Sequence, residues 1–175
     1  KLDLANSELY INADVPEFGY DEKKFTNTKL SGTGNSDTLR ANVTVDDIAM
    51  SDSLHFPETK LVLSASNDVS DVQLTTSAGK TLNKAELNAR VHTLQDGVKL
   101  HFFPSEFIVN DKRWQLEKDG ELSIRKNYID ASEIIFNHGD QRIVLSSEFD
   151  DLTSQTHVVA RLTKVNLGDF MPLAF

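Results

Sequence analysis

Three pairs of carboxylates are the first residues of this sequence whose types and spacing could do chemistry. Two facing carboxylates can hydrolyse a glycosidic bond, one as the acid and the other as nucleophile or base. The pairs are Asp46 with Asp47, Glu117 with Asp119, and Asp150 with Asp151. Their members are adjacent or lie in turns, and neighbours on a strand project to opposite faces. We therefore interpret these acids as solvated and predict no glycosidase site.

The remaining polar residues offer no metal, thiol or phosphate chemistry. Five histidines are scattered without the HxH or HExxH spacing of a zinc site: His55, His92, His101, His138 and His157. Cysteine is absent, which excludes disulfides, thiolate zinc sites, iron–sulfur clusters and thiol nucleophiles. The Gly32 and Gly34 pair precedes no helix, so it favours a turn over a phosphate loop. We predict a protein that is not an enzyme and that holds no metal or cofactor.

Composition narrows the class of protein further. Of the 175 residues, 39% are hydrophobic and 26% are charged, which is typical of one folded unit. The net charge of −9 and the lack of a basic run argue against nucleic acid as a partner. No apolar stretch has the length of a membrane span. The chain opens without Met and ends on an apolar segment, so we expect residues 1–175 to be a single β-rich segment of a longer polypeptide.

Apolar and polar residues alternate along most of the chain. This period of two is typical of strands with one face toward water. It recurs around residues 9–15, 39–46, 61–65, 72–76, 87–91, 98–102, 143–145 and 158–162. Turn residues separate these segments, and Asp96-Gly97 and Asp119-Gly120 are the strongest hairpin or tight-turn candidates. We therefore predict an all-β protein.

Two segments break the alternation. The apolar face shifts by one residue between Val45 and Ile48, and again between Ala131 and Ile134. A β-bulge would absorb each shift and bend the strand.

The apolar positions of these strands are mostly middle-sized aliphatic residues. Burying one Val or Leu contributes about 1.5–3 kcal/mol, so either the sheet folds on itself or something apolar lies against it. We predict an elongated, curved sheet that forms an open hydrophobic trough. The predicted lining residues are Leu39, Ala41, Val43, Val45, Leu61, Leu63, Ala65, Val72, Leu74, Leu87, Ala89, Val91, Val98 and Leu100.

The segment from Phe103 to Ile124 is the most individual part of the sequence. It contains an Ile/Val-Asn-x-x-x-Trp-x-Leu core, centred on Trp114, and a downstream Leu122-Ser123-Ile124 strand. With the phrases at 30–34 and 165–170, it resembles the C-terminal region of TamB proteins of the AsmA-like superfamily, especially their Bacteroidetes branch. A simpler interpretation of the same segment is a hairpin whose Trp anchors one wall.

The resemblance implies a large envelope protein of Gram-negative bacteria, anchored in the inner membrane and spanning the periplasm toward the outer membrane. Its fold would be the open trough called a β-taco. Such proteins are implicated in carrying phospholipid and, with a BamA-related outer-membrane barrel, in assembling outer-membrane proteins. The resemblance assigns no catalytic residues to this chain, because the family has no catalytic motif. Only the strand pattern and the Trp block can be matched to the family.

Three functions follow as alternatives. In the first, the lining residues carry phospholipid acyl chains between the membranes. In the second, the edges of the trough act as a chaperone-like surface that pairs with nascent outer-membrane strands by β-augmentation. The third is a closed β-sandwich binding module with a dry core and an exposed aromatic platform at Trp114.

Overall fold

The computed structural model describes residues 2–3, 7–51, 54–77, 82–117, 120–126, 128–151 and 155–171. It is all-β, as the alternation predicts. The strands are β1 (Leu2–Asp3), β2 (Glu8–Tyr20), β3 (Lys23–Gly34), β4 (Thr38–Ala49), β5 (His55–Ser66), β6 (Val69–Thr76), β7 (Leu82–Leu94), β8 (Gly97–Phe102), β9 (Glu106–Val109), β10 (Lys112–Leu116), β11 (Glu121–Arg125), β12 (Ile129–Ser132), β13 (Ile134–His138), β14 (Gln141–Asp150) and β15 (Gln155–Thr163). A short 3₁₀ helix, η1 (Leu167–Asp169), follows them.

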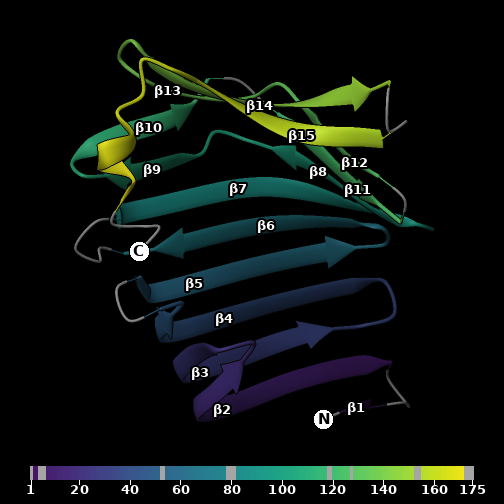
Figure 1. The fold of residues 1–175 in the computed structure, drawn as a ribbon. Helices are drawn as coiled ribbons and strands as arrows, with labels where there is room; N and C mark the ends of the chain where they lie inside the picture. Colours follow the sequence, from purple (N-terminus) through teal and green to yellow (C-terminus); the bar gives the residue numbers. More distant parts are fainter. Residues whose placement is uncertain are drawn as a thin grey trace.

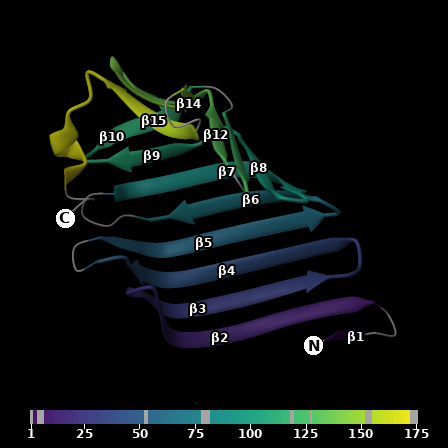
Figure 2. The same cartoon turned by 45° about the vertical axis from the view of Figure 1, so that its right-hand side comes forward.

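These strands form one antiparallel sheet that curves and does not close, so the fold is an open trough. Strands β2 to β7 lie side by side in chain order (Figure 1). The long strand β7 then pairs with β9 along its first half and with β8 along its second half. Beyond β7 the sheet rolls over, and β12 lies against β14 and β15 (Figure 2). The main path of paired strands ends at β1 and at β15, and β12, which pairs only with β11 among the described strands, is a further edge.

A line of strand interruptions explains where the sheet rolls. Strands β8 and β9 are one antiparallel partner of β7, interrupted at 103–105, and β10 and β11 are likewise interrupted at 117–120. At the first interruption the N–H of Phe103 donates to the carbonyl of Asn88 at 2.9 Å, and the N–H of Asn88 donates to Ser105 Oγ at 3.0 Å. Bulges bend strands, and bulges in register on successive strands bend the whole sheet.

The shift of the apolar face between Ala131 and Ile134 coincides with a strand interruption that belongs to this line. Glu133 has a φ of 55° and separates β12 from β13. Because it reverses the alternation, both Ala131 and Ile134 are buried, with exposed fractions of 4% and 5%.

The prediction of a β-bulge between Val45 and Ile48 is wrong, because β4 carries no extra residue there. Strand β4 keeps one register with β5 across this point, from Val45 opposite Thr59 to Asp47 opposite Pro57. The irregularity lies instead on the flanking strands, where Asn27 and Glu58 have φ values of 49° and 48°. A left-handed residue redirects a strand without adding a residue, so the shift needed no insertion.

Gly97 follows the two-residue connection between β7 and β8, where the sequence predicted a tight turn. Its φ is not positive, so conformational freedom is not the reason for glycine here. Gly97 pairs with Arg125 of β11, and a Cβ at this position would collide with the carbonyl oxygen of Ile124. Of the other predicted turn, Asp119 lies outside the described residues and Gly120 is buried against Ile134.

We expect Gly97→Ala to lower the free energy of unfolding by about 1–3 kcal/mol, because the methyl group forces β8 and β11 apart. Chemical denaturation followed by circular dichroism measures this loss. Gly19→Ala is the matched control, because its nearest neighbour would be 3.7 Å away. Equal midpoints for the two variants would contradict the close approach of β8 and β11.

Candidate functional site

The strand register places all fourteen predicted lining residues on one face of the sheet. Residues directly opposite on paired strands share a face, as do alternate residues of one strand. Val43, Leu61, Leu74 and Leu87 form one row across four strands. Ala41, Leu63, Val72 and Ala89 form the next row, and Leu39, Ala65, Val91 and Leu100 lie in a third. Val45 and Val98 extend the two ends of this face, opposite Thr59 and Thr93.

This apolar face is only partly covered. Val45 and Ala89 are buried, with exposed fractions of 6% and 8%, and the other twelve lining residues are half-buried. The whole chain exposes 11312 Å². A compact monomer of 19.6 kDa exposes about 8,600 Å². The excess is what a sheet with one uncovered apolar face produces.

Four hydroxyl residues interrupt the lining on this face: Thr59, Ser70, Thr76 and Thr93. Thr59 and Thr76 are both buried on this face next to Val45, and the hydroxyl of Thr59 donates to Thr76 Oγ1 at 3.2 Å. The hydroxyl of Thr76 in turn donates to the carbonyl of Pro57 at 2.8 Å. Because both hydroxyls are satisfied within the sheet, only their methyl groups remain for an apolar neighbour.

The same face continues past β7 into aromatic side chains. Ala85 of β7 lies opposite Phe107 of β9, which lies opposite Trp114 of β10. Trp114 is fully buried, and its ring stacks on Phe107 with centroids 6.0 Å apart. Leu116, two residues further along β10, joins a core cluster with Ala131 and Ile134. The trough is therefore open along β3 to β7 and filled by side chains from β9 onward.

The burial of Trp114 bears on the closed-sandwich alternative. Residues 106–116 form the β9–β10 hairpin, with Trp114 anchored inside the roll. The closed-sandwich alternative required an exposed aromatic platform at Trp114, which the structure contradicts. The lining prediction ended at Leu100 and missed Phe107 and Trp114, although their spacing of seven residues is compatible with facing positions of a hairpin.

The C-terminal segment 165–171, which we call the strap, covers this aromatic end. It lies against β9 and β10 in both views (Figures 1 and 2). The ring of Phe170 lies 5.5 Å from that of Trp114, centroid to centroid. Asp169 is buried, forms an ion pair with Lys112 and accepts a hydrogen bond from Asn110 Nδ2 at 3.1 Å. The strap is therefore held to the hairpin by one ring contact and one buried carboxylate.

The carboxylate of Asp169 makes this contact sensitive to acid. The Lys112 ammonium group that donates to it holds the pKa of Asp169 below its usual value, and the Asn110 amide and a protonated His138 act in the same direction. A lowered folded-state pKa stabilises the protein fully above the unfolded pKa of about 4 and loses this contribution as the pH falls through the lower folded value.

We therefore expect the strap to loosen below about pH 4. The fluorescence of Trp114, the single tryptophan of the chain, should shift to longer wavelength in this range, before the circular dichroism of the strands is lost. In Lys112→Met, the transition should begin at a higher pH. An emission maximum that stays constant until the strands unfold would contradict this linkage.

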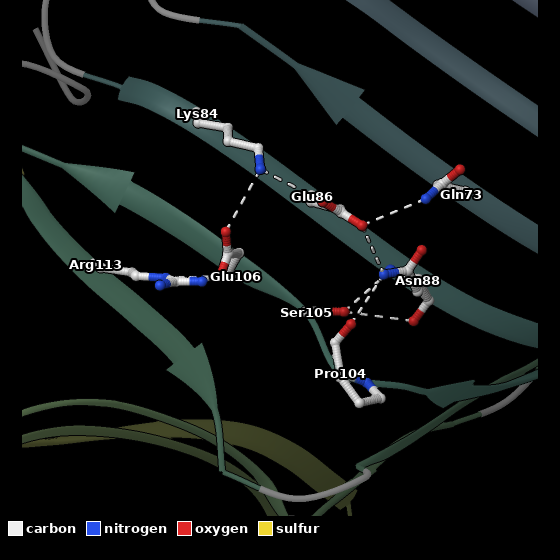
Figure 3. Close-up of polar contacts among 8 residues, drawn as sticks. All are labelled: Gln73, Lys84, Glu86, Asn88, Pro104, Ser105, Glu106 and Arg113. Atoms are coloured by element: carbon white, nitrogen blue, oxygen red, sulfur yellow. Dashed lines mark hydrogen bonds and ion pairs between the residues drawn. The ribbon is translucent and has the colours of Figure 1, made fainter.

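The opposite face of the sheet carries polar side chains. Glu86 on β7 lies directly opposite Glu106 on β9, and Lys84 Nζ lies 3.5 Å from a carboxylate oxygen of each (Figure 3). Arg113 Nε donates to Glu106 at 2.7 Å, and this guanidinium lowers the pKa of Glu106. Glu86, Glu106 and Arg113 line a pocket of about 790 Å³.

Only the strand register brings these two carboxylates together, since they lie twenty residues apart in sequence. Of the acids considered from the sequence, Glu117 also lines this pocket, and its partner Asp119 lies outside the described residues. Asp47 pairs with His55 at 2.8 Å, Glu117 with Arg142 at 3.2 Å and Asp150 with His157 at 4.0 Å. A general acid needs a raised pKa, and Glu106 has a lowered one, so the pair has the chemistry of an ion-pair network.

Within the described ranges, no group of three or more His, Asp or Glu residues is arranged to hold a metal ion. Over the same residues, no helix has the length and apolar character needed to cross a bilayer. Comparison of the chain with protein-family models, curated proteins and solved structures gives no match.

Proposed function

We propose that this chain is a segment of a lipid-carrying bridge whose apolar face holds phospholipid acyl chains. The observation that carries the proposal is an apolar face, three rows wide and interrupted at Ser70, most of whose residues remain half-buried along β4 to β8. Among the described residues no second layer covers this face, and an apolar surface of this extent favours an apolar occupant.

The dimensions of the face suit an acyl chain. From Leu39 to Val45 the lining runs about 20 Å along the strand, and five strands spaced by about 4.8 Å span about 20 Å across. One leaflet of a bilayer contributes about 15 Å of hydrocarbon. An extended acyl chain therefore fits on the lining in either direction.

The chemistry of the face suits hydrocarbon as well. Each methylene removed from water contributes about 0.8 kcal/mol, whereas an unpaired polar group against hydrocarbon costs several kcal/mol. The lining presents aliphatic side chains, and the hydroxyls of Thr59 and Thr76 are already paired. An acyl chain on this face would leave no hydrogen-bonding group of these residues unsatisfied.

The proposal extends to location and partners through the sequence resemblance to TamB proteins. The segment would lie in the periplasm, within an inner-membrane-anchored protein that reaches the outer membrane. A BamA-related barrel would be the partner of the full-length protein. The open-trough fold is compatible with this assignment, and the strand pattern and the Trp114 block support it.

Site-specific photo-crosslinking in cells tests the proposal. A photoreactive residue at Leu63 or Leu74 should capture phospholipid, because both positions lie in the middle of the lining. The same residue at Lys60, an exposed position of β5, should capture none. If Leu63 and Leu74 yield no more lipid than Lys60, the face does not carry acyl chains.

The free edge of β15 favours a second candidate function, the pairing of nascent outer-membrane strands. β15 is paired only with β14, and it continues the apolar face with Val158 and Leu162, which are 43% and 47% exposed. An unpaired edge with exposed apolar side chains is a template for β-augmentation. Photo-crosslinkers on β15 should then trap polypeptide, whereas capture of lipid alone would exclude this function.

A further inference from the structure

The strap lies on the same apolar face of the sheet as the lining residues. Trp114 and Phe107 are joined to Ala85 by direct strand pairing, and Ala85 lies on the same face of β7 as Leu87. Phe170 contacts the ring of the fully buried Trp114, with ring centroids 5.5 Å apart and ring planes at 58°. Phe170 is therefore an apolar occupant that the chain supplies to its own trough.

The attachment of the strap is small compared with that of a strand. Within the described residues its backbone hydrogen bonds are internal, from Asp169 N to Asn166 O and from Phe170 N to Leu167 O. Leu167 and Met171 point away from the core and are 61% and 57% exposed. The Asp169 carboxylate and the Phe170 ring make its polar and aromatic contacts with the sheet. Segments with few buried contacts open locally at low free-energy cost.

We propose that the strap is a removable plug, and that an acyl chain competes with Phe170 for the surface of Trp114. This inference rests on the proposed function and adds a regulated subsite to it. With the strap closed, the acyl-binding face ends at β7. With the strap released, the face extends over Phe107 and Trp114 toward β13. The affinity for an acyl chain at this end is reduced by the fraction of molecules in which the strap is closed.

Brominated fatty acid tests the competition, because bromine quenches tryptophan on contact and Trp114 is the single tryptophan. In the wild-type chain, quenching of Trp114 should be weak. In Phe170→Ala, which removes the plug, and Asp169→Asn, which weakens its attachment, half-maximal quenching should occur at about three- to tenfold lower ligand concentration. Leu167→Ala is the matched control, because this strap residue is exposed and should leave quenching as in the wild type.

A parallel measurement separates this inference from the proposed function. Each variant also carries a photo-crosslinker at Leu63, which reports acyl binding on the open part of the face. Capture at Leu63 together with equal quenching in all variants would overturn the plug and leave the proposed function intact. Absence of both signals would overturn the two together. Circular dichroism of each variant confirms that the strands are formed, so unfolding is not mistaken for release of the strap.

Discussion

Replacing Leu63 with Asp should abolish acyl binding while the strands remain formed. Leu63 lies in the central row of the lining, between Ala41 and Val72, and is half-buried. A carboxylate facing hydrocarbon costs about 3 kcal/mol or more, which corresponds to at least about a 100-fold loss of affinity. Titration with a fluorescent fatty acid measures the loss, and far-ultraviolet circular dichroism reports the strand content.

Ser64→Asp is the control for this prediction. Ser64 is the next residue of β5, is exposed and lies on the opposite face, so it introduces the same charge at the same height of the sheet. Its affinity should match that of the wild type. Equal affinities for the Leu63 and Ser64 variants would mean that the acyl chain binds elsewhere, and Val43→Glu in the neighbouring row should repeat the result of Leu63→Asp.

Replacing Trp114 with Ala should remove a large part of the stability of the whole chain. Trp114 has no exposed surface and contacts Phe107, His138 and Phe170. Truncating a buried Trp to Ala costs about 3–5 kcal/mol, against a total of about 5–15 kcal/mol for a typical domain. Urea denaturation followed by circular dichroism measures this loss, because the variant has no tryptophan fluorescence.

Two further variants serve as comparisons for Trp114→Ala. Trp114→Phe should cost less than Trp114→Ala, since it keeps an aromatic ring and the indole Nε1 has no hydrogen-bond partner among the described residues. Tyr20→Ala removes an aromatic ring that is 73% exposed and should change stability by less than about 0.5 kcal/mol. If Trp114→Ala unfolds at the wild-type midpoint, the filled end of the trough is not a core.

The sheet has two parts with different roles. The open part, β3 to β7, presents half-buried aliphatic residues to an occupant outside the chain. The rolled part, β9 to β15, contains most of the buried hydrophobic residues among those described, including Val109, Trp114 and Ile134. We infer that the rolled part stabilises the sheet at one end, so that the other part can leave its apolar face uncovered.

The sequence was sufficient for the all-β class and for the shared face of the lining residues. Both depend on the alternation of neighbouring side chains, which is a local property of a strand. Val43, Leu61, Leu74 and Leu87 could be placed on one face because each strand shows the alternation by itself. The kink at Glu133 was also predictable, because the apolar face shifts by one residue within the short segment from Ala131 to Ile134.

Only the tertiary structure decided where the trough is open and where it is filled. The pairing of Glu86 with Glu106, the burial of Trp114 and the contact of Phe170 with Trp114 join residues far apart in sequence. The roll itself arises because interruptions on successive strands come into register, and register is set by pairing between strands. Alternation specifies which side of a strand is apolar, but whether protein or another molecule covers that side depends on how far the sheet bends.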